Sequence, residues 1–334
     1  MIRDRIYGSF EIGEQVLVDL IHTPAMQRLR KIYEAARFPN NNEKMISSTR
    51  YQHSVGVMLL LRKYGASMDE QIAGLLHDVS HTAFSHAIDR VVGDHVKQDY
   101  QDNRHDGYVR STGIPSILAK HGYDVGRIVD IKSGAYRLLE NQLPDICADR
   151  IDYSLRNFAK WENPRAVGTC LQGLVNYKGR FVFLSRPIAR LFAENYLECQ
   201  IRNWGSVKYN AMEYIFSKAL MLAMRKGIIN IGDLLYTYDN YVMGKLRKSR
   251  DRDIRELLGI LEHRIRYHEV RKDPDYINRV KLRYTDPYYA DGGRLRKLSE
   301  NDPAFRKRLD AYLAADPVRI RFDYGPEIRR LLTQ

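Results

Sequence analysis

The chain has 334 residues, a formal net charge of +13 and 44% hydrophobic residues. A chain of this length and composition can bury a sizeable core, either in one large domain or in a domain with an appendage. No apolar run approaches the ~20 residues that a membrane span needs, so we expect no membrane contact. The three cysteines are widely spaced and odd in number, which argues against a disulfide framework and predicts a cytoplasmic location.

The positive charge favours phosphorylated partners, which are either nucleotides or nucleic acid. A basic but merely solvated surface explains the same charge equally well. The most basic segment, residues 245–252, is a candidate contact for nucleic acid or for a regulatory nucleotide, although Asp251 and Asp253 balance it in part. The first residues carry charges where a secretion signal needs an apolar block, so we expect no such signal.

In the N-terminal part, residues 1–13, and residues 7–12 in particular, are predicted to form a short strand or loop. Apolar residues at helical spacing predict a helix from residue 13 onward. Pro24 suits the first turn of the next helix. Residues 38–50, which hold a proline and three successive asparagines, are predicted to form a loop.

The middle of the chain is predicted to be helical with polar interruptions. Asp69 is expected to be the N-cap of one of these helices, and residues 87–113 are expected to be less regular. The predicted helices span residues 53–64, 69–77, 114–121, 124–131 and 144–158.

The second half combines long helices with short strands. Residues 171–184 are predicted to form a β-hairpin around an Asn-Tyr-Lys-Gly turn. Apolar stripes at three and four spacing predict core helices. The predicted helices are 188–203, 206–226, 254–265 and 304–313, and the predicted strands near the C-terminus are 279–284 and 318–322.

Histidines gather around one stretch, residues 75–86, which reads Leu-Leu-His-Asp-Val-Ser-His-Thr-Ala-Phe-Ser-His. Seven of the ten histidines of the chain fall between residues 53 and 121. Such clustering indicates a metal or acid–base site more than a packed core.

A metal site follows if three helices meet here. His53 opens one predicted helix, His77 and Asp78 close another, and Asp149 lies on a third. Two imidazoles and two carboxylates can hold one divalent ion in octahedral geometry, with positions left for water and a phosphate oxygen.

Two other readings of these histidines stand beside this one. His77 and His81 have the i, i+4 spacing of a zinc-protease helix, but that motif needs a glutamate where this chain has Asp78. An isolated His-Asp pair is also common in proteins without any site, and His77 with His81 also suits a surface polar pair.

The order of these residues resembles the HD-domain metal phosphohydrolases, and most closely the subgroup that contains the deoxynucleoside triphosphate triphosphohydrolases. The similarity runs from about residue 2 to residue 270. The segments that carry it are Ile2-Arg3-Asp4 with Gly8, Gln27-Arg28-Leu29-Arg30, Arg50-x-x-His53-Ser54-x-Gly56-Val57, His77-Asp78-x-x-His81-x-x-Phe84-Ser85-His86, Asp149-Arg150-x-Asp152-Tyr153, Tyr238-Asp239-Asn240 and Glu262-His263-Arg264.

The resemblance implies a role for each matching residue. One divalent ion, which is Mn, Fe, Ni, Zn or Mg, would be held by His53, His77, Asp78 and Asp149. The reaction centre would be lined by His81, His86, Asp89 and His105. Phosphates would be bound by Arg50, Arg150 and Tyr153, and Gln27 would face the sugar.

Two departures from the family pattern bear on the substrate. The family often has Leu-Gly-His-Gly-Pro where this chain has Val79-Ser80-His81-Thr82-Ala83, so the turn is expected to differ in shape. Asn157 stands where the family usually has an aspartate that is associated with the sugar 3′-hydroxyl. Asn157 is still able to form hydrogen bonds but is uncharged, so the sugar preference stays open.

The resemblance also implies an architecture. We expect a mainly α protein with an HD-domain helical bundle core, a small β-hairpin and a mixed α/β C-terminal appendage. The predicted units are a catalytic core at 1–165, a helical continuation with the hairpin at 166–270 that completes the active-site cleft, and the appendage at 271–334. A homo-oligomer is expected because oligomers are usual in the family.

The leading hypothesis is hydrolysis of a (deoxy)nucleoside triphosphate to nucleoside and triphosphate. A second enzymatic hypothesis is a nucleotidase or phosphomonoesterase that releases phosphate. The alternative from another class is a nucleic-acid-binding regulatory protein that retains the HD shell, which the net charge of +13 motivates. Steep salt dependence of nucleic-acid binding without turnover would favour this alternative.

Overall fold

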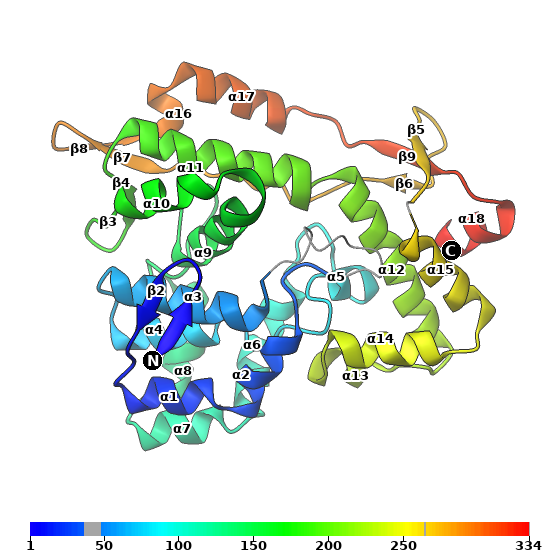
Figure 1. Cartoon of the computed structure of the whole chain (residues 1–334), viewed down its shortest axis with the longest axis horizontal. Helices are drawn as coiled ribbons and strands as arrows, with labels where there is room; N and C mark the ends of the chain where they lie inside the picture. The colour runs from blue at the N-terminus through cyan, green and yellow to red at the C-terminus, as the bar shows by residue number, and fades with distance from the viewer. Residues whose placement is uncertain (37–47, 264, 334) are drawn as a thin grey trace.

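The computed structural model describes residues 1–36, 48–263 and 265–333. The predicted loop at 38–50 lies almost entirely outside these residues. The N-terminal half is helical after one short hairpin, as expected (Figure 1). Its elements are β1 (Ile2–Asp4), β2 (Gly8–Phe10), α1 (Gln15–Ile21), α2 (Pro24–Arg28), η1 (Leu29–Lys31), α3 (Arg50–Lys63), α4 (Met68–Leu76), α5 (Ala87–Val91), α6 (Tyr100–Arg110), α7 (Ile114–Lys120), α8 (Val125–Val129), η3 (Ile131–Ser133) and α9 (Ala148–Asn157).

The second half begins with long helices and ends in short strands and helices. Its helical part comprises η4 (Phe158–Glu162), α10 (Pro164–Gln172), the hairpin β3 (Leu174–Asn176) and β4 (Phe181–Phe183), α11 (Arg186–Cys199), η5 (Gln200–Trp204), α12 (Val207–Arg225), α13 (Ile231–Tyr236), α14 (Asp239–Lys248) and α15 (Arg252–Glu262). The remainder comprises β5 (Tyr267–Glu269), β6 (Tyr276–Ile277), β7 (Tyr288–Asp291), β8 (Arg294–Lys297), α16 (Leu298–Asn301), α17 (Pro303–Leu313), β9 (Arg319–Phe322) and α18 (Pro326–Thr333). The mainly α class is confirmed.

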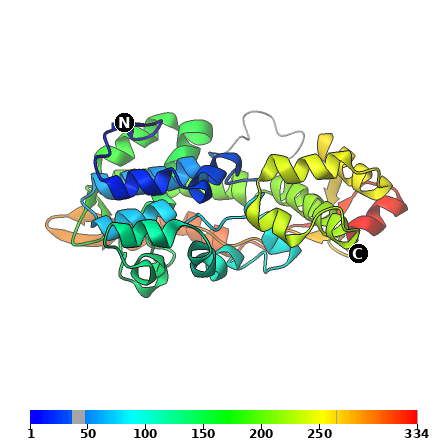
Figure 2. The same cartoon turned by 90° about the horizontal axis from the view of Figure 1, so that it is seen from below.

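Buried apolar side chains form two clusters, which we call the first and second lobes. The first lobe is built on α1 to α4 and α9 to α11, with α16 and α17 packed on it. The second is built on α12, α14 and α15, with α5, β9 and α18. Figure 2 shows the two lobes side by side, with the N-terminus on the first and the C-terminus on the second. The C-terminal residues are therefore shared between lobes, and the unit boundaries at 165 and 270 stay predictions.

The strands form small sheets at the edges of the lobes. The predicted hairpin is present, with Val175 opposite Val182 in antiparallel register, and it is extended by β7 and β8. The predicted strand at 318–322 pairs as β9 with β5 and β6. The strand predicted at 279–284 is wrong: the chain there is extended but joins no ladder of the described sheets.

Local chemistry explains where several helices begin. Thr49 and Gln52 form a reciprocal capping box at the start of α3, which satisfies two backbone N–H groups. Pro24 occupies the first turn of α2 as expected. The N-cap of α4 is Ser67, whose hydroxyl accepts from the Glu70 N–H. The prediction of Asp69 was therefore wrong by two positions.

Two helices, α5 and α6, lie in the segment expected to be less regular. Most residues of these two helices are polar, but a few side chains on each are buried, among them Ile88 on α5 and Val109 on α6. Ile88 belongs to the apolar cluster of the second lobe. Contacts between distant parts of the chain thus stabilise helices that periodicity does not predict.

Candidate metal centre and active site

Three helix ends bring the predicted metal ligands together. His53 lies in the first turn of α3, His77 is the C-cap of α4, and Asp149 lies in the first turn of α9. Asp78 follows His77 directly as the chain leaves the helix. A helix end lets two adjacent residues turn toward one point, which a continuous helix does not allow.

The donor atoms converge. The Nε2 atom of His53 lies 2.9 Å from Oδ1 of Asp149 and 3.2 Å from Nε2 of His77. The Nε2 atom of His77 is 3.6 Å from the same Asp149 oxygen. These three residues form a group whose ligand atoms all lie within 4.8 Å of one another.

Asp78 completes the predicted set from the other side. Its carboxylate oxygens lie 3.5 Å from Nε2 of His77 and 3.7 Å from Nε2 of His53. Arg50 donates from Nη1 to Asp78 at 2.8 Å, and both side chains are buried. Arg50 thus lies beside the predicted ligand Asp78, which partly neutralises its charge, and its phosphate-binding role stays a prediction.

The electrostatics of the cluster match a cation site. Burial opposes ionisation of Asp149, but hydrogen bonds from His53 and His77 hold its pKa well below the usual range. Burial also raises the pKa of Asp78, but the nearby Arg50 guanidinium lowers it. The net effect is a pKa below the usual range. Both carboxylates are therefore anionic at neutral pH, the state in which carboxylates bind metal ions.

The donor set fits a divalent ion. Adjacent ligands around an octahedral ion with bonds of ~2.1 Å lie ~3 Å apart, and the measured separations of 2.9 to 3.7 Å are close to that spacing. Imidazole and carboxylate together suit several first-row metals and Mg²⁺. The possible ligand atoms of a second group, Glu140, Cys147 and Asp149, also lie within 4.8 Å of one another. The Arg150 guanidinium already contacts the Cys147 thiol and the Glu140 carboxylate of this group.

Sequence reasoning assigned no role to Asp152, which lies behind the metal ligand His53. The Oδ2 atom of Asp152 accepts a hydrogen bond from Nδ1 of His53 at 2.7 Å, and Arg156 donates to the same carboxylate. With the Nδ1 proton directed to Asp152, Nε2 is the His53 nitrogen that would bind a metal ion in place of its bond to Asp149. The sequence signal for Asp152 is its spacing of three residues from Asp149, because residues three apart share one face of a helix.

Two of the predicted reaction-centre histidines are buried beside the cluster. The Nε2 atom of His81 lies 3.0 Å from Oδ1 of Asp78, and Nδ1 of His105 lies 3.4 Å from the Ser80 hydroxyl. Burial and the charge of Arg50 lower the pKa of His81 to about 3, and burial and His77 lower that of His105 to about 4. In the described part of the chain, Nδ1 of His81 and Nε2 of His105 have no hydrogen-bond partner.

His86 and Asp89 form the pair that their spacing suggests. His86 caps α5, and its Nδ1 lies 3.2 Å from Oδ2 of the fully buried Asp89. The His86 and His81 rings meet edge to face, with centroids 5.5 Å apart. An oriented, partly exposed histidine beside the metal ligands suits proton transfer.

The turn before His86 takes an unusual path. Phe84 and Ser85 have φ values of 60° and 49°, in the left-handed region that non-glycine residues rarely adopt. The second lobe holds this turn, because the Phe84 N–H donates to Asp239 at 2.8 Å and its ring packs on Phe216. The second lobe therefore shapes the active site through the path of this turn.

The predicted substrate-binding residues lie in different surroundings. The hydroxyl groups of Tyr153 and Tyr196 are hydrogen-bonded at 2.7 Å. The ring centroid of Tyr153 lies 6.3 Å from the ring centroid of His53. The Arg150 guanidinium is held by the loop before α9, including the Asn141 carbonyl at 2.7 Å. The Asn157 amide turns back along its own helix to the Tyr153 carbonyl.

Gln27 lines a groove of about 1390 Å³ between α2, α6, α7 and the end of α13. Its amide donates to the Ile21 carbonyl at 2.7 Å, and its oxygen accepts from Arg30. The next residue, Arg28, reaches the active-site turn and donates to the His81 carbonyl at 2.6 Å. The structure thus places Gln27 in this basic groove, and its sugar-facing role stays a prediction.

A helical fold with two histidines, two aspartates and nearby acid–base histidines defines the class of metal-dependent hydrolases. The chain belongs to the HD-domain metal-dependent phosphohydrolase superfamily, and the HD domain family matches residues 50–157. That span contains all four residues of the predicted metal set. No helix among the described residues is both long and apolar enough to span a membrane.

Relatives agree with this assignment. The uncharacterized protein YdhJ of Bacillus subtilis is 38% identical over 289 residues, which are 86% of this chain and 87% of YdhJ. The metal-dependent phosphohydrolase cns2 of Cordyceps militaris is 39% identical over 159 residues, 47% of this chain and 44% of that protein. The deoxynucleoside triphosphate triphosphohydrolase SAMHD1 homolog of Dictyostelium discoideum is 27% identical over 230 residues, 58% of this chain and 43% of that protein.

The fold has a solved counterpart. The crystal structure of a phosphohydrolase (BT4208) from Bacteroides thetaiotaomicron superposes with a TM-score of 0.69 and covers 97% of this chain and 99% of that one. The two sequences are 15% identical, so this likeness concerns the fold.

Proposed function

We propose that the protein hydrolyses (deoxy)nucleoside triphosphates to nucleoside and triphosphate. The observation that carries the proposal is the grouping of His53, His77, Asp78 and Asp149 next to the His86–Asp89 pair. The similarity to the Dictyostelium triphosphohydrolase supports a nucleotide substrate.

The residues divide the chemistry between them. His53, His77, Asp78 and Asp149 would hold a divalent ion, which would polarise the phosphoryl group and support a water nucleophile at neutral pH. His86, oriented by Asp89, delivers a proton to the leaving oxygen. Arg50 and Arg150 would turn their guanidinium groups from Asp78 and from the loop before α9 to the phosphate oxygens, whose geometry they match.

A second candidate reaction is release of phosphate from a nucleoside monophosphate. The 39% identity to cns2, higher than that to the triphosphohydrolase homolog, supports a phosphohydrolase of unspecified substrate. We also infer a cytoplasmic homo-oligomer, with no membrane partner.

Nucleic-acid binding through residues 245–252 has less support. Lys245 pairs with Asp233 at 2.8 Å, and Arg252 pairs with Glu256 and Glu327 at 3.1 and 3.0 Å. These bonds engage two of the five basic side chains of the segment.

Product analysis by anion-exchange chromatography tests the proposal. The protein is incubated with each dNTP, NTP and monophosphate, with Mn²⁺ or Mg²⁺ added in turn. Nucleoside plus inorganic triphosphate is the expected result. Phosphate from monophosphates only would select the second candidate, and folded protein without turnover on any of these substrates would contradict both.

A further inference from the structure

Residues 278–287, which join β6 to β7, run as an extended segment with an inverted polarity pattern. Leu282 is 48% exposed, whereas its neighbours Lys281 and Arg283 are half-buried. Successive side chains of an extended chain point to opposite faces. The apolar residue therefore faces water and the two cations face the protein, the reverse of what burial energetics favour.

The segment is anchored at two points by hydrogen bonds to other parts of the chain. The buried side chain of Gln200 donates to the Lys281 carbonyl at 3.2 Å. Further along, the Asp286 N–H donates to the Pro144 carbonyl at 3.0 Å, in the same loop that holds Arg150. The two cations are thus presented by anchored backbone.

Both cations reach the loop that precedes α6, the helix that carries His105. Lys281 donates from Nζ to the Lys97 carbonyl at 3.0 Å, and Arg283 donates to the side-chain oxygen of Gln98. Within the described residues neither cation forms an ion pair with a carboxylate. The carboxylates of Asp102 and Glu140 oppose the lowering of the Lys281 pKa by burial but form no ion pair with it among the described residues. Partly burying two neighbouring positive charges is costly, so an anion is the expected partner.

Geometry brings these cations to the side of Arg150, because the Asp286 N–H bonds to the Pro144 carbonyl and Arg150 donates to the Asn141 carbonyl of the same loop. Burial, followed by the charges of Tyr196 and Asp149, raises the pKa of Tyr153 well above its usual value, and the cations Arg150 and Arg283 oppose this shift. Burial and the charge of Arg283 lower the pKa of Lys281, with Arg150 adding to the effect. Arg150, Lys281 and Arg283 therefore act on one region, next to Tyr153.

We propose that Lys281 and Arg283 bind the polyphosphate tail of the substrate, on the side of the active site formed by Tyr153 and Arg150. This inference rests on the proposed function and deepens it, because a second pair of cations beyond the metal centre fits a triphosphate better than a monophosphate. Arginine binds phosphate oxygens through two parallel N–H groups, whereas lysine binds them as a single point charge.

Lys281→Met and Arg283→Met, singly and together, test the proposal. Methionine keeps an apolar stem of similar length and removes the charge. Binding of inorganic tripolyphosphate is measured by titration calorimetry in excess Mg²⁺, together with KM for a nucleoside triphosphate. Hydrolysis of 4-nitrophenyl phosphate reports on the metal centre.

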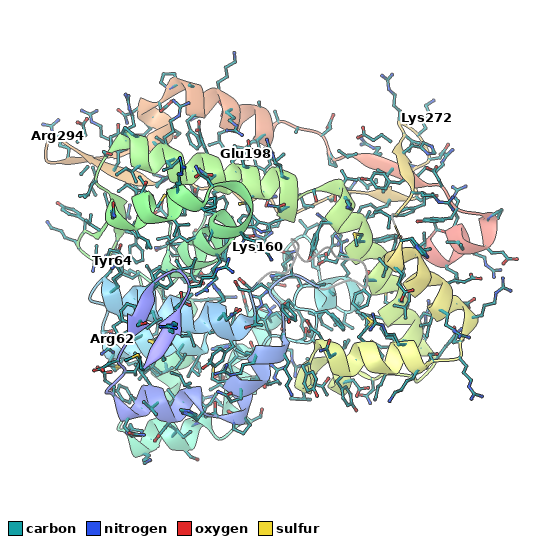
Figure 3. All side chains as sticks on the ribbon, in the orientation of Figure 1. Arg62, Tyr64, Lys160, Glu198, Lys272 and Arg294 are labelled. Carbon is teal, nitrogen blue, oxygen red and sulfur yellow. The ribbon has the colours of Figure 1, made fainter. Side chains whose placement is uncertain are left out.

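Each single change is expected to weaken tripolyphosphate binding by about tenfold, as for the loss of one charged hydrogen bond, and the double change by more. KM for the triphosphate should rise in parallel, while the rate with 4-nitrophenyl phosphate and the binding of orthophosphate change less than twofold. Lys272→Met and Arg294→Met are the matched controls, because Figure 3 shows both side chains at outer edges of the molecule and both are exposed.

The outcomes separate this inference from the proposed function. If the wild type turns over a nucleoside triphosphate and the double variant keeps its tripolyphosphate affinity and KM, this inference is overturned and the function stands. If the wild type binds tripolyphosphate through these cations but hydrolyses no nucleoside triphosphate, the function fails and the anion site stands. A wild type that binds no tripolyphosphate overturns the inference directly.

Discussion

The Nδ1 atom of His53 lies 2.7 Å from the carboxylate of Asp152, while its Nε2 atom lies 2.9 Å from Asp149. One helix, α9, thus supplies both a predicted ligand, Asp149, and the group that orients another predicted ligand, His53. Carboxylate, histidine and metal in this order fix the ring tautomer and raise the basicity of the ligating nitrogen.

Replacing Asp152 with Asn should weaken metal binding by about 10- to 100-fold, because the neutral amide orients His53 less strongly. The measurement is activity as a function of Mn²⁺ concentration. Activity should return at high metal concentration, a rescue that a purely structural defect would not show. Asp145→Asn is the control, since the ion pairs of the Asp145 carboxylate with described residues, Arg180 and Lys297, are longer, at 3.7 and 3.6 Å.

Removing the metal should lower both activity and thermal stability. An ion present at 100 times its Kd stabilises the fold by ~2.7 kcal/mol, which corresponds to a fall in Tm of about 5 °C for a chain of this size. Scanning calorimetry before and after dialysis against a chelator measures the shift. Asp149→Ala should abolish turnover and show no such shift, and a variant with full activity would refute the ligand assignment.

His86→Gln should lower kcat by about 100-fold or more, because proton transfer to the leaving oxygen is lost. Asp89→Asn should have a smaller effect, since Asp89 acts through His86. The pH profile of kcat separates the two roles: it should flatten in His86→Gln and shift in Asp89→Asn. Unchanged kcat in His86→Gln, with folding verified by circular dichroism, would remove His86 from the mechanism.

Gly56→Ala should destabilise the protein by about 3 kcal/mol, as expected when a buried site is overpacked. A Cβ at Gly56 would overlap the guanidinium of Arg156 and the carboxylate of Asp152. Gly107→Ala is the matched control in another helix, where the added methyl meets nothing within 4 Å. It should stabilise the protein by ~0.5–1 kcal/mol. Urea unfolding of both variants measures these changes in stability. Equal urea midpoints for the two variants would contradict close packing at Gly56.

Much of the fold could be predicted because the signals are local. The apolar spacing from Val16 to Ile21 and the Asn-Tyr-Lys-Gly turn each depend on a few neighbouring residues. Helices α5 and α6 could not be predicted in this way, because the contacts that stabilise them come from distant parts of the chain.

By itself, the sequence determined the residue types of the metal centre and their order along the chain, because four ligands in a recurring pattern carry their chemistry wherever the helices place them. Tertiary structure decided what each one faces. It set Asp152 behind His53, turned Arg150 toward the loop before α9, and brought Lys281 and Arg283 against the loop that precedes α6. The physical reason is that direction and burial arise from long-range packing, which spacing along one helix or strand does not encode.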